Sequence, residues 1–246
     1  MKKNLLIIGA TSGIISSCLE NLLEMNFKIY ATYSRKESLK NIPQNILNSN
    51  NIKFLKLNLN QSNKKIINSI KKNKINADAI IYAVGGSFGI KEYSYNLKFW
   101  QKSLDLNIFK HILINNYFLK KMIKKKYGRI LFFSTTAVDD KNASITYSAS
   151  KAFLENYVKK SAIIFGKHNI LINCLKTSII AAKNNNWYKG TKQNPKRVNK
   201  IAKEYLSVER IGNSQDLLDY IKLIISSRNK FTNGSILSVD GGLKKF

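Results

Sequence analysis

The sequence predicts an α/β fold: a doubly wound parallel sheet of about seven strands with helices on both faces. Three observations support this fold class. Short runs of Val, Ile, Leu and Phe are apolar throughout, as in strands buried on both faces. These runs alternate with longer segments of helical periodicity. The 246 residues are 44% hydrophobic, enough for one substantial core, so we expect residues 1–246 to form a single domain.

Strands and helices are expected to alternate along the whole chain. The expected strands span residues 4–8, 27–33, 52–57, 78–84, 128–134, 169–175 and 235–239. The expected helices span residues 13–25, 62–72, 97–124, 145–166 and 214–226. The asparagine-rich segment at about 181–206 interrupts this alternation, and long irregular segments of this kind often cover a site. We therefore predict a lid inserted there.

The first strand runs directly into a glycine-containing turn and then a helix. Glycine allows the backbone to turn tightly and to approach a phosphate closely, and the free N–H groups at a helix start favour an anion. A plain strand-to-helix turn is the alternative interpretation. We predict that this turn binds a pyrophosphate through Gly9, Thr11, Ser12, Gly13 and Ile14.

The end of the second strand bears on the choice of cofactor. It reads Tyr33-Ser34-Arg35, and no acidic residue precedes Glu37. In dinucleotide-binding sheets an acid at this place binds the ribose hydroxyls of NAD, whereas Arg accepts the 2′-phosphate of NADP. Ser34 and Arg35 therefore favour NADP over NAD. A solvated Arg35 is the alternative.

The fifth strand and the helix after it carry the candidate chemistry. Ser134 follows the apolar run Ile130 to Phe133, so its hydroxyl is expected at the carboxyl edge of the sheet, where open α/β sheets bind ligands. Tyr147 and Lys151 lie four residues apart and share a helix face. Such pairs also occur on solvated helices. Because an ammonium stabilises a neighbouring phenolate, the pair suits proton transfer, and Ser134 nearby favours a catalytic site.

Together these motifs resemble those of the short-chain dehydrogenase/reductase family, over nearly all of the chain. The family's glycine motif matches Gly9 and Gly13, and its fourth-strand segment, which ends in glycine, matches Ile81 to Gly85. Its catalytic residues match Asn107, Ser134, Tyr147 and Lys151. Later segments also match, namely Ile170 to Asn173, Arg210-Ile211-Gly212 and Asn233 to Gly242.

The resemblance implies a single-domain Rossmann fold and hydride transfer between a nicotinamide and a carbonyl or secondary alcohol. Tyr147 would protonate the oxygen and Ser134 would orient it. Lys151 would act on both Tyr147 and the nicotinamide ribose. Asn107 would position a water, unless it only caps or kinks its helix. The cofactor would also contact Asn58, Leu59, Gly85 and Ile179.

Three positions depart from the family pattern. Ile15 replaces the third glycine, where backbone and cofactor approach closely. Tyr82-Ala83 stands where Asn-Asn is common, and Thr177-Ser178 replaces Pro-Gly after the sixth strand. Since the catalytic set is complete, an active enzyme is favoured over a non-catalytic NADP-binding protein. The compact 3-oxoacyl-[acyl-carrier-protein] reductases suggest a 3-oxoacyl thioester or small ketone as substrate, and a sugar or polysaccharide-precursor dehydrogenase is the alternative.

The formal net charge of +28 comes mostly from Lys spread through every segment, which indicates solvated helix faces and no nucleic-acid site. No apolar run approaches the ~20 residues of a membrane span, and the early apolar run stops at Gly9. We therefore expect a cytoplasmic protein without membrane contact. No metal site is expected, because Cys18, Cys174, His111 and His168 are dispersed. The apolar helices over 97–124 and 145–166 predict a homodimer or homotetramer.

Overall fold

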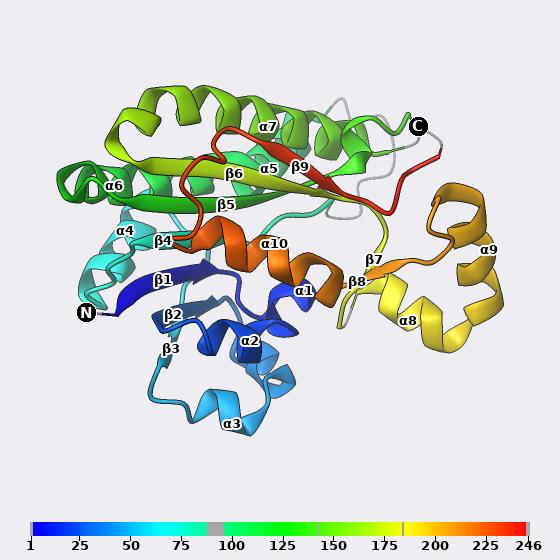
Figure 1. Ribbon diagram of the computed structural model, residues 1–246, viewed down its shortest axis with the longest axis horizontal. Coiled ribbons are helices and arrows are strands. Elements are labelled where there is room, and N and C mark those ends of the chain that lie inside the picture. The colour runs from blue at the N-terminus through cyan, green and yellow to red at the C-terminus, as the bar shows by residue number, and fades with distance from the viewer. Residues whose placement is uncertain (1, 88–95, 142, 184, 245–246) are drawn as a thin grey trace.

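The computed structural model describes residues 2–87, 96–141, 143–183 and 185–244. Within them, seven parallel strands form one sheet in the order β3-β2-β1-β4-β5-β6-β9, with helices on both faces (Figure 1). This confirms the predicted fold class. The strands are β1 Lys3–Ile8, β2 Phe27–Tyr33, β3 Ile52–Lys56, β4 Ala79–Tyr82, β5 Gly128–Thr135, β6 Ile170–Thr177 and β9 Ile236–Val239.

Alternate strand residues build two hydrophobic layers, one on each face of the sheet. On β1, Leu6 and Ile8 belong to the layer under α4, α6 and α7, whereas Leu5 and Ile7 belong to the layer under α1, α2 and α10. The helices are α1 Gly13–Ser16, α2 Leu19–Leu23, α3 Gln44–Leu47, α4 Asn63–Lys72, α5 Leu97–Leu104, α6 Lys110–Lys125, α7 Ile145–Phe165 and α10 Gln215–Ile225. Short 3-10 turns are η1 Lys36–Asn41, η3 Thr136–Val138 and η4 Gly166–His168.

Two predicted helices are interrupted. The first, expected over 13–25, breaks between α1 and α2, where the hydroxyls of Ser16 and Ser17 donate to the Gly13 carbonyl at 3.2 and 3.0 Å. Such back-bonding competes with the helical hydrogen bonds. The second, expected over 97–124, contains the π-helical turn η2 Asp105–Phe109 between α5 and α6. This turn widens the helix at Asn107, and π-bulges often mark functional sites.

The segment predicted as a lid has regular structure. Two helices, α8 Asn186–Gln193 and α9 Pro195–Tyr205, follow the short strand β7 Ile180–Ala181, which pairs with β8 Gly212–Asn213. Their starts explain the asparagines of this segment, because Asn185 and Asn194 accept N-cap hydrogen bonds from Tyr188 N and Arg197 N. In Figure 1, α8 and α9 lie beyond the carboxyl end of the sheet.

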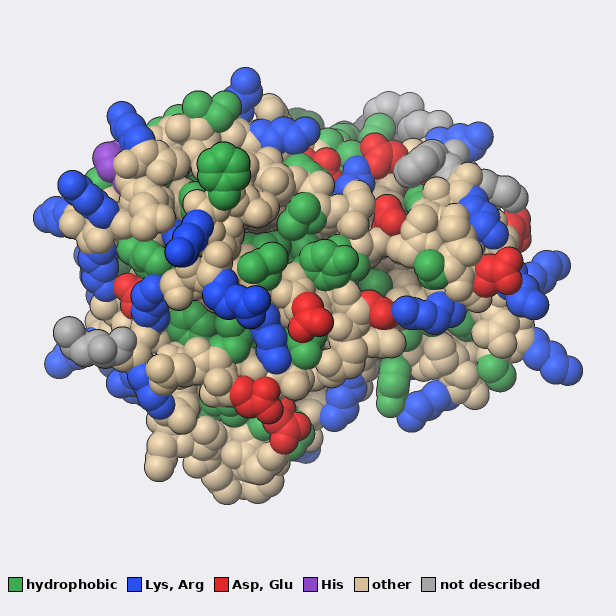
Figure 2. Space-filling view, viewed as in Figure 1, with side chains coloured by type: hydrophobic (Ala, Val, Ile, Leu, Met, Phe, Trp, Pro, Cys, Tyr) green, Lys and Arg blue, Asp and Glu red, His purple; other side chains and the backbone are tan. Residues whose placement is uncertain are grey.

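Basic side chains are spread over the visible face in Figure 2 and do not gather over one element. No described helix is long and apolar enough to cross a membrane. Over the same described residues, no three His, Cys, Asp or Glu side chains form a group that could hold a metal ion. Cys18 and Cys174 are both buried free thiols.

Candidate active site

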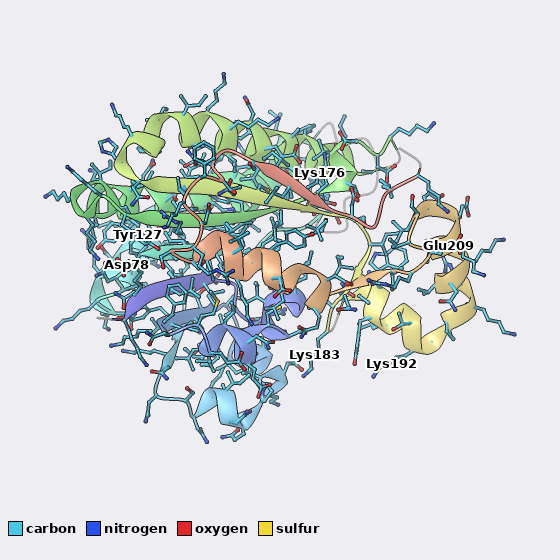
Figure 3. All side chains as sticks on the ribbon, in the orientation of Figure 1. Asp78, Tyr127, Lys176, Lys183, Lys192 and Glu209 are labelled. Atoms are coloured by element: carbon cyan, nitrogen blue, oxygen red, sulfur yellow. The ribbon has the colours of Figure 1, made fainter. Side chains whose placement is uncertain are left out.

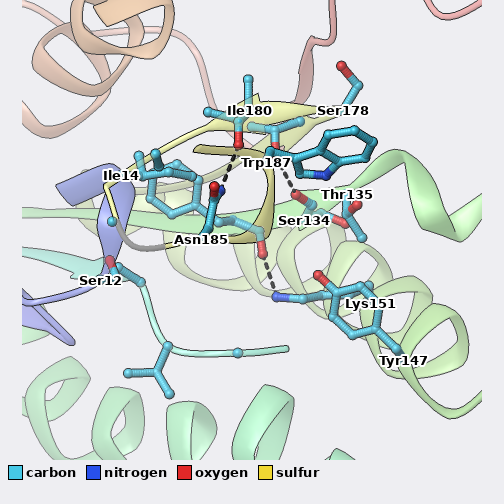
Figure 4. A pocket seen from close by; sticks show the side chains of 17 residues that line it. Ser12, Ile14, Ser134, Thr135, Tyr147, Lys151, Ser178, Ile180, Asn185 and Trp187 are labelled. Carbon is cyan, nitrogen blue, oxygen red and sulfur yellow. Dashed lines mark hydrogen bonds between the residues drawn. The ribbon is translucent and has the colours of Figure 1, made fainter. Parts of the chain in front are cut away.

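A cavity of about 290 Å³ opens at the carboxyl edge of the sheet (Figure 4). Ser12 and Ile14 lie on one side of it, Tyr147 and Lys151 lie opposite, and Trp187 of α8 lies above them. The cavity brings together many residues that the sequence predicted, namely Ser12, Gly13, Ile14, Gly85, Ser134, Tyr147 and Lys151. Distant parts of the sequence therefore converge on one site.

The last three residues of β5 contact one face of α7. Lys151 Nζ donates to the Phe133 carbonyl at 2.7 Å, and Ser134 Oγ donates to Glu155 Oε1 at 2.6 Å. Lys151 and Glu155 lie one helical turn apart on α7, which explains why neighbouring strand residues reach both. These contacts fix the strand end against the helix.

The hydroxyl next to the Tyr147 phenol belongs to Thr135, which makes a side-chain hydrogen bond with Tyr147. Thr135 also accepts from Ala137 N at 3.2 Å, which caps η3. Ser134 lines the same cavity, but its hydroxyl is engaged by Glu155. Thr135 could not be predicted from the sequence, because Ser134 and Thr135 are adjacent hydroxyl residues and only side-chain contacts distinguish them.

Burial dominates the protonation of Tyr147 and Lys151. Lys151 is 5% exposed, and loss of solvation lowers its pKa to about 8, although Cys174 and, less strongly, Glu155 act in the opposite direction. Burial raises the pKa of Tyr147, against the lowering effect of its hydrogen bond with Thr135. The sequence predicts that the Lys151 ammonium lowers the pKa of Tyr147. The structure differs: burial and the Thr135 hydrogen bond are the causes of the Tyr147 shift, and the ammonium is held on the Phe133 carbonyl, 5.9 Å from the Tyr147 ring centre.

Asn107 braces the turn after β4 from within the π-helical turn. Its Oδ1 accepts from Gly86 N at 3.0 Å, and its Nδ2 donates to the Ser103 carbonyl at 3.0 Å. A Cβ atom on Gly85 would lie 2.6 Å from Asn107 Oδ1 and 3.1 Å from Lys151 Nζ, so this position requires glycine. The side-chain amide therefore holds Gly85 and Gly86 beside the Lys151 amine.

The opposite side of the cavity has the features of a phosphate cradle. Gly9 has a φ of +86°, a left-handed conformation that favours glycine, and its N–H donates to Thr32 Oγ1 at 3.0 Å. A Cβ atom on Gly13 would lie 2.4 Å from the Lys183 carbonyl oxygen. Ser12 Oγ is buried and has no hydrogen-bond partner among the described residues, which is costly unless a ligand supplies one. These residues fit a phosphate group.

Residues 3–193 match the family model described as short chain dehydrogenase. The chain belongs to this family of NAD(P)-dependent oxidoreductases. A 3-oxoacyl-[acyl-carrier-protein] reductase from Aquifex aeolicus is 23% identical over 243 residues, covering 97% of this chain and 96% of that protein. An L-rhamnose 1-dehydrogenase (NADP(+)) from Thermoplasma acidophilum is 23% identical over 247 residues, covering 98% and 96%. The solved structure of ElxO with NADP bound is 26% identical with a TM-score of 0.83, and the match covers 98% of each chain.

The structure accommodates the three departures from the short-chain dehydrogenase pattern by burial at two positions and by hydrogen bonds at the third. Ile15 is fully buried in the core beside α10, and it is not among the residues that line the cavity. Tyr82 is buried and stacks on Phe132 at 4.6 Å. Thr177 and Ser178 make up for the absent Pro-Gly with side-chain hydrogen bonds to the carbonyls of Ser134 and Asp240, at 3.5 and 2.6 Å.

The remaining predicted cofactor residues do not line the cavity. Ser34 and Arg35 are exposed just after β2, and Thr11 is half-buried in the cradle turn. Asn58 Oδ1 accepts from Asn60 N at 3.0 Å, and Leu59 is a core residue. The Ile179 carbonyl accepts from Gly212 N at 2.9 Å, where β7 meets β8. The predicted cofactor residues that follow β2, β3 and β6 lie close to the carboxyl ends of these strands. They therefore share the sheet edge with the cavity.

Proposed function

We propose that this chain is an NADPH-dependent carbonyl reductase. The observation that carries the proposal is the pairing, across one cavity, of the Tyr147 and Lys151 face of α7 with the cradle around Ser12. A proton donor and a phosphate site on opposite walls suit a substrate and a dinucleotide lying side by side. The NADP-bound structure of ElxO, similar over 98% of the chain, supports the choice of cofactor.

In this proposal the cradle and the end of β2 hold the cofactor. The backbone of Gly9 to Gly13 and the unpartnered Ser12 hydroxyl bind the pyrophosphate. Ser34 and Arg35, exposed at the same sheet edge, bind the 2′-phosphate by charge-assisted hydrogen bonds. Bound NADPH supplies a hydride to the carbonyl carbon.

The residues of α7 and β5 handle the proton. Tyr147 gives its phenolic proton to the carbonyl oxygen, so that the ketone becomes an alcohol once the hydride has been added. Thr135, hydrogen-bonded to Tyr147, orients that oxygen. Lys151 stabilises the phenolate that remains and holds the nicotinamide ribose, while Asn107 braces the turn beside the Lys151 amine. Ser134 is the alternative orienting hydroxyl, and its bond to Glu155 argues for Thr135.

A 3-oxoacyl thioester is the substrate class that we favour, because a relative named for that activity aligns over nearly its full length. A sugar is the second candidate, since a rhamnose dehydrogenase aligns over a similar span. Loss of absorbance from NADPH and from NADH, measured with 3-oxoacyl thioesters, simple ketones and aldonolactones, separates these classes. We expect turnover with NADPH and a 3-oxoacyl thioester. NADPH binding without turnover of any compound would instead favour a non-catalytic binding protein.

We also infer a homodimer or homotetramer. Phe109 and Phe153 are each 45% exposed and contact each other edge to face at 6.3 Å across η2 and α7. Phe99 and Ile145 are exposed on α5 and α7. Large apolar side chains gathered on an exposed surface often mark an interface. Light scattering at micromolar concentration should give a multiple of the chain mass, and Phe153→Ser should lower it; a monomeric wild type would refute the inference.

A further inference from the structure

A largely covered glutamate lies on the same face of α7 as Tyr147 and Lys151 and has no role in the proposed proton transfer. Glu155 follows Lys151 by four residues, as Lys151 follows Tyr147, so three successive turns of the helix present these side chains on one face. The Glu155 side chain is only 13% exposed. Because glutamate is rarely buried unless it is paired, its partners indicate what it does.

Two partners hold the Glu155 carboxylate. Ser134 Oγ donates to it at 2.6 Å, and Lys176 Nζ lies 3.6 Å from the same oxygen. Lys176, labelled in Figure 3, lies on β6 directly beside Ser134 in the strand register, and it also pairs with Asp139. Asp139 follows η3, in the segment that leads from β5 to α7. The cluster thus joins β5, β6, α7 and this segment.

The charges around Lys151 single out Glu155. Burial lowers the pKa of His111 on α6 to about 3, and burial raises the pKa of Cys174 on β6 to about 12. Burial also raises the pKa of Tyr147. All three groups are therefore neutral near pH 7. Cys174 and, less strongly, Glu155 act to raise the pKa of Lys151, and because the Cys174 thiol is neutral near pH 7, the negative charge comes from the Glu155 carboxylate on the next turn of α7.

We propose that Glu155 is a positioning residue of the reaction: it holds the end of β5 through Ser134 and supplies the negative charge that keeps the buried Lys151 amine protonated. This rests on the proposed reductase function, because it extends the pair of Tyr147 and Lys151 by one helical turn. It also gives Ser134 a role, since its hydroxyl orients the carboxylate while Thr135 faces the substrate.

Glu155→Gln tests the proposal, because the amide keeps the shape and an acceptor for Ser134 but removes the charge. In the wild type, kcat should fall at alkaline pH as Lys151 loses its proton. In Glu155→Gln this fall should begin about one pH unit lower, as expected for one charge a helical turn away. We expect a loss of kcat of about tenfold at pH 8.5 and less than about twofold at pH 6.5. An unchanged pH profile would overturn the proposal.

Asp139→Asn is the matched control, because it neutralises a carboxylate of the same cluster that bonds Lys176 and does not act on Lys151. It should leave the alkaline fall of kcat in place. A shift as large as that of Glu155→Gln would show that any change in the cluster alters the profile, and would overturn the specific role of Glu155.

A titration without substrate separates this proposal from the reductase function. The 13Cε signal of Lys151, assigned by its absence in Lys151→Met, should titrate near pH 8 in the wild type and at lower pH in Glu155→Gln. An inactive wild type would refute the reductase function, whereas an unchanged midpoint would refute the role of Glu155. If Glu155→Gln does not fold, Glu155→Met combined with Lys176→Met is compared with Lys176→Met alone, so that the two variants differ only at Glu155. An equal Lys151 midpoint in these two folded variants would also overturn the proposal.

Discussion

The two walls of the cavity differ in how their polar groups are satisfied. On the α7 wall, Lys151 is bonded to Phe133 and Thr135 to Tyr147, so the protein itself fixes the reacting groups. On the cradle wall, the buried hydroxyl of Ser12 has no partner within the described part of the chain. The comparison indicates that the fold preorganises the α7 wall, which we propose to be the catalytic wall, whereas the cradle wall keeps a polar group for the ligand that we propose there.

Removing the transferable proton should give the largest difference between the two walls, because it should affect carbonyl reduction and not cofactor binding. Tyr147→Phe keeps the ring and removes the phenolic oxygen, so we expect carbonyl reduction to fall by about a thousandfold. The dissociation constant for NADPH, measured by fluorescence titration, should stay within about twofold, because the cradle is unchanged. Turnover above a tenth of the wild-type rate would rule out the assigned role of Tyr147.

Acid should lower the stability of the fold that carries both walls through His111, which is buried on α6 against Tyr82. Burial lowers the His111 pKa from 6.5 to about 3, so the unfolded chain binds this proton more tightly. The stability that neutral His111 contributes is fully present above pH 6.5 and is lost as pH falls through 6.5 towards 3. Between pH 7 and 4 the wild type should lose about 3 kcal/mol more unfolding free energy than His111→Leu. Urea unfolding at both pH values measures this, and equal losses would contradict a buried neutral His111.

The cradle wall should respond to Arg35 with a change in cofactor preference. One charge-assisted contact to the 2′-phosphate is worth about ten- to a hundredfold in NADP over NAD binding. Arg35→Ala should remove most of this preference and leave kcat at saturating NADPH unchanged. The dissociation constants of NADP and NAD, measured for the wild type and Arg35→Ala, test this prediction. If the ratio of the two constants is the same in both proteins, Arg35 is a solvated surface residue.

The sequence predicted the elements that depend on periodicity and missed contacts that depend on side-chain direction. The alternation of strands and helices along the chain follows from apolar runs, and the shared face of Tyr147 and Lys151 follows from a four-residue spacing. The break after Ser16 does not, because two hydroxyls that bond to the Gly13 carbonyl compete locally with helix formation. The regular helices of the segment predicted as a lid were missed because its asparagines, typical of loops, serve as helix caps.

Glu155 and Thr135 were missed for a related reason. Glu155 lies one helical turn after Lys151, and Thr135 lies directly after Ser134, so the earlier residue of each pair matched the expected pattern. No spacing rule reveals that each of the last three residues of β5 bonds to α7. The direction of the Ser134 hydroxyl depends on a carboxylate that lies 21 residues away in the chain. Only the packed structure brings the two together.

The measurement that tests the account most directly compares Ser134→Ala with Thr135→Ala. Both changes remove one hydroxyl from adjacent residues that line the same cavity. We predict that Thr135→Ala lowers kcat about a hundredfold and that Thr135→Ser restores it, whereas Ser134→Ala lowers kcat less than about fivefold. A hundredfold loss in Ser134→Ala with near wild-type turnover in Thr135→Ala would contradict the assignment of the catalytic wall.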